Sequence, residues 1–446
     1  MFKRKITDEM LAWKNTPNKK ALIVKGLRQV GKTTSVRAFA QQNYENVVYV
    51  NFKSNNSAKR IFDDDLVINR ITTDLSALLP DARFVPYKTV IIFDEIQECA
   101  NARSSIKAFV EDGRYDVIGT GSLLGIKGYN KKKSKGVPVG FEKTIYMKPM
   151  DFEEFLWAKG IQQNVIDYLK DSYRSLTRIS ETTHRAMIRY FKEYICVGGM
   201  PRVVNVFVTS NDMNAVYDEQ RDLIEEYKDD FGKHLDENEQ EETNMVLLTR
   251  INNVFDSIPA QLAKENKKFV FSAMSKKGRS SEYMPAIQWL KDYGLINFCY
   301  NLSTIDRPLE GYKIDNIFKL YFVDSGLFIS MLERGTASKI LNDNLNIYKG
   351  AIYENIIADA FSKNGISLYY FHKESGLEID FVSVINDLLS IVEVKARTGN
   401  SKSAKTVLND KTRYNADNMI KLGEYNIGVK GNMITLPFYL SFLLQE

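Results

Sequence analysis

The sequence predicts an α/β protein with a parallel β-sheet in its first part, then a helical region and a second α/β part. Three observations lead to this fold class. Apolar runs of buried-strand type recur in the first 150 residues, a glycine-rich octapeptide follows the first run, and an acidic pair ends the third. The expected strands are residues 21–24, 46–52, 89–93, 115–119 and 143–147.

The octapeptide Gly-Leu-Arg-Gln-Val-Gly-Lys-Thr begins at Gly26 and fits the phosphate-binding P-loop pattern. Gly26 and Gly31 allow a tight turn, so that backbone amides point at phosphate oxygens. We expect Lys32 to reach the β- and γ-phosphates of ATP, and the Thr33 hydroxyl to bind Mg²⁺. Thr34 opens a helical stretch whose N-terminus faces the anion. An ordinary glycine-rich turn is the alternative interpretation.

An acidic pair, Asp94 and Glu95, follows the strand expected at 89–93. We expect Asp94 to hold Mg²⁺ and Glu95 to polarise the attacking water, which favours the ATPase branch of P-loop proteins with a catalytic glutamate. A solvated strand end is the alternative. Thr120 and Ser122 end the next strand and are candidates for a sensor beside the γ-phosphate, or they simply start a loop. The extra strand between the two motifs predicts the strand order 5-1-4-3-2.

The composition predicts a cytoplasmic protein. In 446 residues no apolar run approaches the ~20 residues that cross a membrane, and the first residues lack the apolar core of a signal peptide. Three scattered cysteines and three histidines have no metal-ligand spacing. Because 61 basic residues nearly balance 56 acidic ones, nucleic-acid binding would require local basic patches.

Beyond the expected sheet, the helical region extends from 151 to 240 and is expected to form a lid over the nucleotide. Asp151 with Glu154 gives a capping-box-like helix start, and the helical spacing is interrupted at 198–201. A basic loop precedes this region; it either contacts phosphate-rich partners or forms solvated surface. Its lysines are Lys127, Lys131, Lys132, Lys133 and Lys135.

Residues 241–330 predict a winged-helix-like module. Two helical stretches, 245–263 and 283–293, precede two strand-like runs, 294–300 and 317–322. Basic residues gather between the helices, which fits DNA contact by a helix and a wing. Docking of a protein is the alternative. The basic residues are Lys267, Lys268, Lys276, Lys277 and Arg279.

Residues 331–446 carry acidic residues in the order of a PD-(D/E)xK nuclease, a restriction-endonuclease-like α/β module. Glu354 lies on an expected helix, Asp380 in one strand, and Glu393 with Lys395 in the next. In an active site of this kind Asp380 and Glu393 would hold Mg²⁺, and Lys395 would orient or activate the hydrolytic water. A catalytically inactive version, with the acids kept for salt bridges, is the alternative. The flanking apolar runs favour these residues, since Asp212 with Glu226 imitates the spacing in a polar helical region.

The chain resembles the prokaryotic AAA-type P-loop ATPases that are fused to a C-terminal domain of unknown function with a nuclease-like fold. The resemblance implies ATP binding through Gly26 to Thr34 and hydrolysis at Asp94 and Glu95. It leaves the arginine finger unassigned between Arg103 and Arg114. The motifs that carry it begin at Gly26, Ile92, Gly119, Met150, Gly198, Lys319, Gly350, Glu378 and Glu393.

Two hypotheses follow for function. The first is an Mg²⁺-dependent ATPase in domain 1–150 that drives a winged helix and a DNA endonuclease. The second is an ATP-switched regulatory or scaffolding protein with an inactive nuclease-like domain. ATP and Mg²⁺ are the expected cofactors of both. DNA is the expected partner of the first, a protein partner or an oligomer is open in either, and no membrane is expected.

Overall fold

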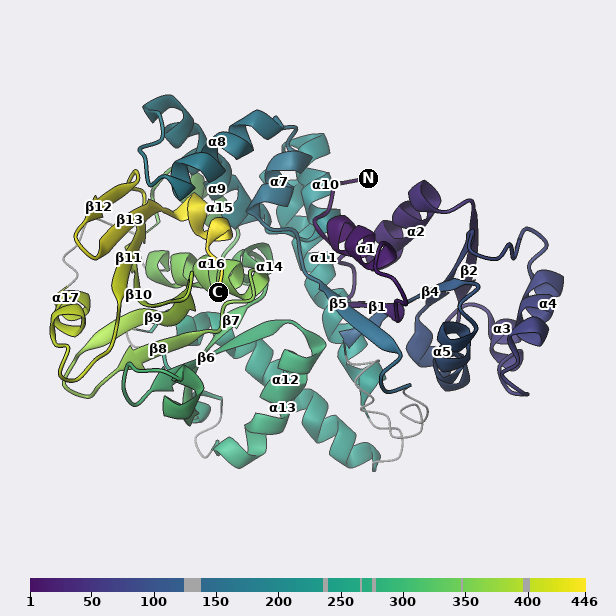
Figure 1. Cartoon of the computed structure of the whole chain (residues 1–446). Helices are drawn as coiled ribbons and strands as arrows, with labels where there is room; N and C mark the ends of the chain where they lie inside the picture. The colour runs from purple at the N-terminus through teal and green to yellow at the C-terminus, as the bar shows by residue number, and fades with distance from the viewer. Residues whose placement is uncertain (124–137, 236–239, 265–266, 275–277, 346–347, 396–401) are drawn as a thin grey trace. The chain divides into compact units, whose positions relative to one another are not determined.

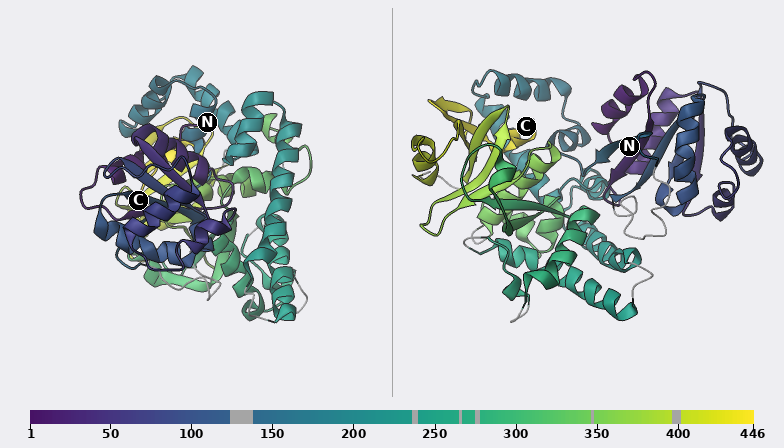
Figure 2. Two further views of the ribbon diagram at one scale, coloured as in Figure 1. Left: turned by 90° about the vertical axis from the view of Figure 1, so that its right-hand side faces the viewer. Right: turned by 60° about the horizontal axis from the view of Figure 1, so that its bottom comes forward.

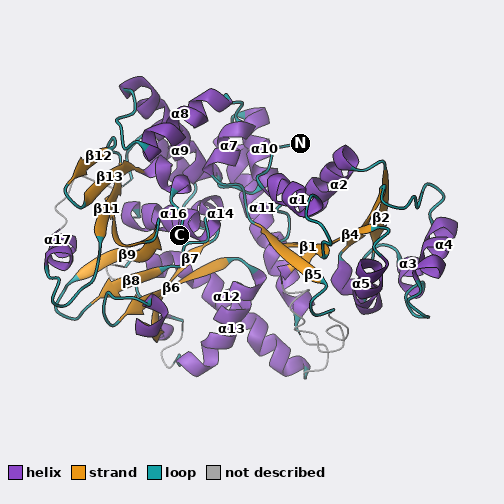
Figure 3. Cartoon of the chain, viewed as in Figure 1, coloured by secondary structure: helices purple, strands orange, loops and turns teal. Residues whose placement is uncertain are grey.

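The computed structural model describes the chain except for residues 124–137, 236–239, 265–266, 275–277, 346–347 and 396–401 (Figure 1). The expected basic loop and two lysines of the 241–330 cluster, Lys276 and Lys277, lie outside the described residues. The chain forms two compact units, residues 1–148 with 229–248 and residues 149–228 with 249–446. Figure 3 shows the helices and strands of each.

The first unit contains a five-stranded sheet in which every neighbouring pair is parallel, in the order β2-β3-β4-β1-β5. This confirms the order predicted from the strand between the two motifs. Strand β3 is buried along its whole length, as its continuous apolar run predicts. The strands are β1 (Ala21–Gly26), β2 (Asn46–Asn51), β3 (Thr89–Asp94), β4 (Asp116–Ser122) and β5 (Glu142–Met147).

Helices α2 and α5 pack on this sheet (Figure 2). The apolar side chains of α4 and α5 join those of the strands in one core. Helix α2 starts at Lys32, directly after the glycine-rich loop that leaves β1. The chain therefore carries its phosphate-loop motif from a buried strand into a helix N-terminus, as the pattern predicts. The helices of this part are α1 (Ile6–Lys14), α2 (Lys32–Asn43), α3 (Asn56–Arg60), α4 (Ile68–Leu78) and α5 (Ala100–Asp112).

A helical region follows β5. The predicted capping box is present, because Asp151 accepts a hydrogen bond from the Glu154 amide while the Glu154 side chain accepts one from the Asp151 amide. The predicted interruption is also present, between α9 and α10. The placement of these helices as a nucleotide lid stays a prediction. They are α7 (Phe152–Ala158), α8 (Gln163–Arg174), α9 (Glu181–Val197), α10 (Pro201–Ser210) and α11 (Met213–Phe231).

The second unit contains a mixed eight-stranded sheet in the order β12-β13-β11-β10-β9-β8-β6-β7. The strands expected to form a two-stranded wing are β6 and β7 of this sheet. β6 pairs with β7 on one side and in parallel with β8 on the other, so its backbone groups are used within the sheet. The strands are β6 (Ile296–Leu302), β7 (Lys313–Phe322), β8 (Tyr369–His372), β9 (Glu378–Ile385), β10 (Leu388–Lys395), β11 (Asn418–Gly423), β12 (Gly428–Lys430) and β13 (Met433–Pro437).

The remaining helices include the two expected before the wing and the one expected to carry Glu354. Helix α16 packs on β7 and β10, and so places its side chains over the middle of the sheet. No helix of the described residues is long and apolar enough to span a membrane. These helices are α12 (Glu241–Leu262), α13 (Ser280–Tyr293), α14 (Ser325–Ser330), α15 (Thr336–Leu341), α16 (Lys349–Lys363) and α17 (Lys402–Asn409).

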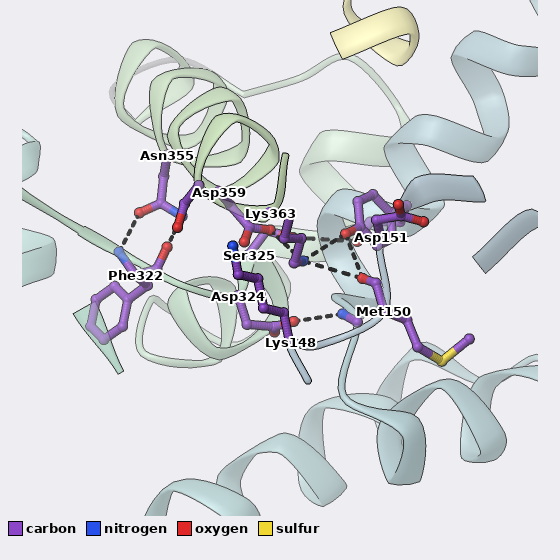
Figure 4. A network of polar contacts seen from close by, with 12 residues as sticks. Lys148, Met150, Asp151, Phe322, Asp324, Ser325, Asn355, Asp359 and Lys363 are labelled. Carbon is purple, nitrogen blue, oxygen red and sulfur yellow. Dashed lines mark hydrogen bonds and ion pairs between the residues drawn. The ribbon is translucent and has the colours of Figure 1, made fainter. Parts of the chain in front are cut away.

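A buried polar network explains several motifs of the second unit (Figure 4). The Met150 amide donates to the Gly199 carbonyl at 2.7 Å, and Lys363 Nζ donates to the Met150 carbonyl at 3.2 Å. Asp324 Oδ2 accepts a hydrogen bond from the Gly199 amide at 2.6 Å. A Cβ atom on Gly199 would lie 2.0 Å from the Met150 carbonyl oxygen. The close approach of these segments therefore requires glycine.

Candidate functional site

The loop between β1 and α2 has the backbone of a phosphate cradle. Gly31 has φ +91°, and Gln29 has φ +65°, a left-handed conformation that is uncommon for a residue with a side chain. A Cβ atom on Gly26 would lie 2.3 Å from the carbonyl oxygen of Met147 at the end of β5. Both predicted glycines are thus required by geometry, one by its dihedral angle and one by close packing.

Lys32 lies with its ammonium group inside this loop. Its Nζ donates hydrogen bonds to the carbonyls of Gly26 and Leu27, each at 2.9 Å, and the residue is 8% exposed. Burial lowers the pKa of Lys32 to about 8, although Glu95 and Asp94 act in the opposite direction. The loop therefore holds a nearly buried cation, the charge that binds phosphate oxygens, and two carboxylates lie near it.

Among the described residues, the Asp94 carboxylate accepts four hydrogen bonds, and two of them come from predicted site residues. Thr33 Oγ1 donates to Asp94 Oδ1 at 3.0 Å, and the Thr120 hydroxyl donates to the same oxygen. Tyr49 Oη and Asn51 Nδ2 donate to Oδ2 at 2.6 and 2.9 Å. The sequence analysis missed Tyr49 and Asn51, although Asn51 is the last residue of β2 and lies in register with Asp94.

Glu95 directly follows β3 and has φ +53°. Its side chain accepts a hydrogen bond from Gln97 Nε2, and Gln97, like Tyr49 and Asn51, was not predicted as a site residue. Ser122 is buried and lies in register with Gly26, so it sits at the base of the phosphate loop. Thr34 is exposed on α2. The structure therefore gathers the predicted residues at the carboxyl edge of the sheet, with Thr34 at the margin.

These residues fit an Mg²⁺–ATP complex by the chemistry of their donors. A threonine hydroxyl and an aspartate carboxylate meet at 3.0 Å, and hard oxygen donors are those that Mg²⁺ prefers.

Both candidates for the arginine finger form ion pairs within the chain. Arg103 makes a two-pronged ion pair with Glu142, both contacts at 2.9 Å, and Arg114 pairs with Asp112 at 2.8 Å.

The predicted nuclease-like residues also come together, on β9, β10 and α16. Phe381 of β9 lies opposite Val392 of β10 in an antiparallel pair, so Asp380 and Glu393 are the next cross-strand neighbours. Asp380 Oδ2 accepts a hydrogen bond from the Val394 amide at 2.8 Å. Burial raises the pKa of Asp380 to about 7, and the nearby Glu354 and Glu393 add to the effect.

Lysine residues neutralise the other two carboxylates of this cluster. Glu354 is 3% exposed; it pairs with Lys267, lies 3.7 Å from Lys319 Nζ, and accepts a hydrogen bond from Tyr321 Oη at 3.0 Å. Although burial opposes the change, the two lysines lower the pKa of Glu354. Glu393 pairs with Lys395. The sequence analysis missed Lys319, and it assigned Lys267 to a DNA-binding cluster.

Two of the three carboxylates that a nuclease would use at this site, Glu354 and Glu393, are paired with lysines, and metal binding there stays a prediction. Within the described parts of the chain, no group of three or more histidine, cysteine, aspartate or glutamate residues is arranged to hold a metal ion. A metal at Glu354 would have to displace two lysine ammonium groups. Glu393 pairs with Lys395, and Asp380 Oδ2 accepts a hydrogen bond from a backbone amide.

Comparisons with known families agree with the first site. Residues 18–156 match the AAA domain family AAA_14. Residues 188–338 match the domain of unknown function DUF8612, and residues 349–439 match the domain of unknown function DUF4143. No curated protein matches the chain in sequence.

Several solved structures resemble the chain at a low level. The Walker-type ATPase PABY2304 of Pyrococcus abyssi is 13% identical, with 74% of this chain and 96% of that chain covered and a TM-score of 0.41. The ORC2 protein of Aeropyrum pernix is 10% identical, with 76% and 90% covered and a TM-score of 0.33. The RuvB Holliday junction branch migration motor of Thermotoga maritima is 14% identical, with 66% and 89% covered and a TM-score of 0.29. Similarity at this level supports no functional assignment.

The phosphate cradle, the Thr33–Asp94 contact and the family match agree with one another. Residues 18–156 are an AAA-type P-loop ATPase domain, which DUF8612 and DUF4143 follow along the chain.

Proposed function

We propose that the chain hydrolyses ATP in an Mg²⁺-dependent reaction at the P-loop. The observation that carries this proposal is the 3.0 Å contact between the Thr33 hydroxyl and the Asp94 carboxylate, beside the buried ammonium group of Lys32. A hydroxyl, a carboxylate and a cation at one end of a parallel sheet are the groups that phosphoryl transfer from ATP uses.

Each residue has a separate task in this proposal. The loop amides and Lys32 bind the phosphates, and Lys32 balances charge that develops on them. Thr33 and Asp94 hold Mg²⁺, which when bound supplies positive charge to the phosphate oxygens. Glu95 accepts a proton from the attacking water, and Gln97 fixes the position of the Glu95 carboxylate. The Thr120 hydroxyl donates a hydrogen bond to Asp94 and so keeps that carboxylate oriented.

Steady-state ATP hydrolysis tests the proposal, with Lys32→Ala as the blank and Lys88→Ala as the matched control. Lys88 is 52% exposed and pairs with a surface glutamate, so its loss should leave turnover unchanged. Lys32→Ala should lower turnover about 10²- to 10³-fold, because it removes a preorganised charge from the transition state. Near-normal turnover in Lys32→Ala would contradict the proposal.

For the C-terminal domain, the lysine ion pairs support the regulatory or scaffolding hypothesis over the nuclease hypothesis. Glu354 and Glu393 each have a lysine partner, so these carboxylates stabilise the domain as a charge-balanced cluster. We therefore propose that ATP binding switches the chain between states that bind DNA or a protein partner, without cleavage by this domain.

Two measurements separate the hypotheses. DNA cleavage with Mg²⁺ or Mn²⁺ should be absent in the wild-type protein, and cleavage that Asp380→Ala abolishes would restore the nuclease hypothesis. ATP hydrolysis should then be compared with and without double-stranded DNA at two salt concentrations. Stimulation that fades with salt indicates phosphate contacts coupled to the nucleotide site, whereas unchanged turnover indicates a protein partner or an oligomer.

A further inference from the structure

An arginine inside the P-loop is held by an acid from a distant part of the chain. Arg28, two residues after Gly26, makes an ion pair with Asp230 near the end of α11, and both residues belong to the first unit. The Asp230 side chain is 5% exposed and that of Arg28 is 25% exposed. A buried carboxylate is thus placed against the loop that is shaped to receive phosphate oxygens.

Arg28 shares the electrostatic environment of the phosphate-binding lysine. Burial is the largest cause that lowers the pKa of Lys32, and Glu95 opposes it. The positive charge of Arg28 is the second cause that lowers this pKa. Two cations in one short loop repel each other, and an anion between or beside them removes that repulsion. Asp230 supplies a negative charge to one of the two, whereas Lys32 has only carbonyl oxygens as hydrogen-bond partners.

Arg28 also differs from the two arginines first considered for the reaction. Arg103 pairs with Glu142 at the start of β5, Arg114 pairs with Asp112 at the end of α5, and neither arginine belongs to the phosphate loop. A guanidinium group binds phosphate in the same two-pronged manner as carboxylate, so an anionic ligand in the loop can replace Asp230 at Arg28.

We propose that Arg28 contacts the β,γ-phosphate end of ATP, and that Asp230 competes with those phosphates for its guanidinium group. The inference rests on the proposed function, since it concerns the same nucleotide site. Asp230 is then an internal anion that restrains ATP binding, and Arg28 is a phosphate-binding residue that belongs to the same chain as the P-loop.

If Asp230 competes with the phosphates, substitutions of Arg28 and Asp230 should change ATP binding in opposite directions. A purely structural ion pair would not give this result. Arg28→Ala removes a phosphate contact and should weaken binding of a non-hydrolysable ATP analogue by about tenfold to a hundredfold. Asp230→Asn removes the competing negative charge and should strengthen binding of the analogue several-fold. In the double variant the loss of Arg28 should dominate. ADP lacks the terminal phosphate, so both single variants should change its affinity less.

The experiment is titration calorimetry of the full chain with Mg²⁺ and either the ATP analogue or ADP, with the exposed Arg60→Ala as control. Weakening of analogue binding by both Arg28→Ala and Asp230→Asn would overturn the proposal, because it would show a purely structural pair. If Asp230→Asn does not fold, Arg28→Lys is measured in its place. Equal losses of affinity for the ATP analogue and for ADP in Arg28→Lys would then overturn the proposal. Failure of the proposed function is a separate result, in which wild-type and Lys32→Ala bind the analogue equally.

Discussion

Asp94 of the first unit and Glu354 of the second are both buried carboxylates, but they are satisfied in different ways. Asp94 accepts hydrogen bonds from two threonines, a tyrosine and an asparagine, all neutral donors. Glu354 faces two lysine ammonium groups. Neutral donors orient a carboxylate and leave its charge for a cation to balance, whereas lysine ion pairs have already balanced it. The two sites therefore differ in whether a metal ion is needed.

The largest expected effect concerns the chemical step at the first site. Glu95→Gln should lower the rate of ATP turnover by about 10²- to 10⁴-fold, because it removes the group that accepts the proton of the attacking water. Binding of ATP should persist, since Lys32 and the loop amides are unchanged. Single-turnover hydrolysis and nucleotide titration measure the two quantities separately.

The control for this variant is Glu111→Gln on α5, whose side chain is 56% exposed and pairs with Lys107 four residues earlier. It should leave turnover unchanged. Equal activity of Glu95→Gln and the wild-type protein would show that another group activates water, and the two sites would then differ less than their hydrogen bonds indicate.

The second prediction tests whether the C-terminal carboxylates need their lysines. Lys319 is fully buried, and although burial opposes the change, Glu354, Glu378 and Asp380 raise its pKa. Lys319→Met should lower the free energy of unfolding by about 3–5 kcal/mol, because it leaves buried negative charge uncompensated. Urea unfolding measures the change.

Lys339→Met is the matched control, since Lys339 is 52% exposed and pairs with an exposed glutamate. Its cost should stay below about 1 kcal/mol. If Mg²⁺ restores the stability of Lys319→Met, a metal can replace the lysine. The two sites would then differ only in which cation, a metal ion or a lysine, balances the carboxylate.

The sequence predicted the first site more completely than the second for a physical reason. The glycines, Lys32 and Thr33 lie within one octapeptide, and its local geometry dictates their roles. The position of Asp94 followed from the parallel strand order, which connection rules restrict. Tyr49 was missed because the pattern of β2 shows a strand and does not show which of its polar residues face the neighbouring strand end.

The second site depends on pairings between distant segments. Lys267 and Glu354 are separated by 87 positions, and no local pattern indicates that a lysine of a basic run turns toward a helix. The pairing of the expected wing strands with the rest of the sheet was missed for the same reason, since the parallel pairing of β6 with β8 is between residues far apart in sequence. The winged helix itself stays a prediction. Helix α16 and the strands β9 and β10 were predicted because their periodicity is local.

The third prediction uses the pH dependence of the first site. Burial lowers the pKa of Lys32 to about 8, and ATP phosphates should raise it in the complex. The protonated form binds phosphate, so affinity is full below pH 8 and falls as the pH rises above 8, by up to about tenfold per pH unit. Titration of an ATP analogue at pH 7, 8 and 9 measures it; Lys32→Ala should show no such fall.

The smallest expected effect tests the neutral donors around Asp94. Tyr49→Phe removes one of four hydrogen bonds and should cost about 0.5–1.5 kcal/mol of stability, because Asn51 still donates to the same carboxylate oxygen. The KM for Mg²⁺–ATP should not rise, since no charge is lost. A stability loss as large as that of Lys319→Met would show that Asp94 depends on its hydrogen bonds as strongly as Glu354 depends on its ion pairs. Thermal and urea unfolding of the two variants side by side decides this.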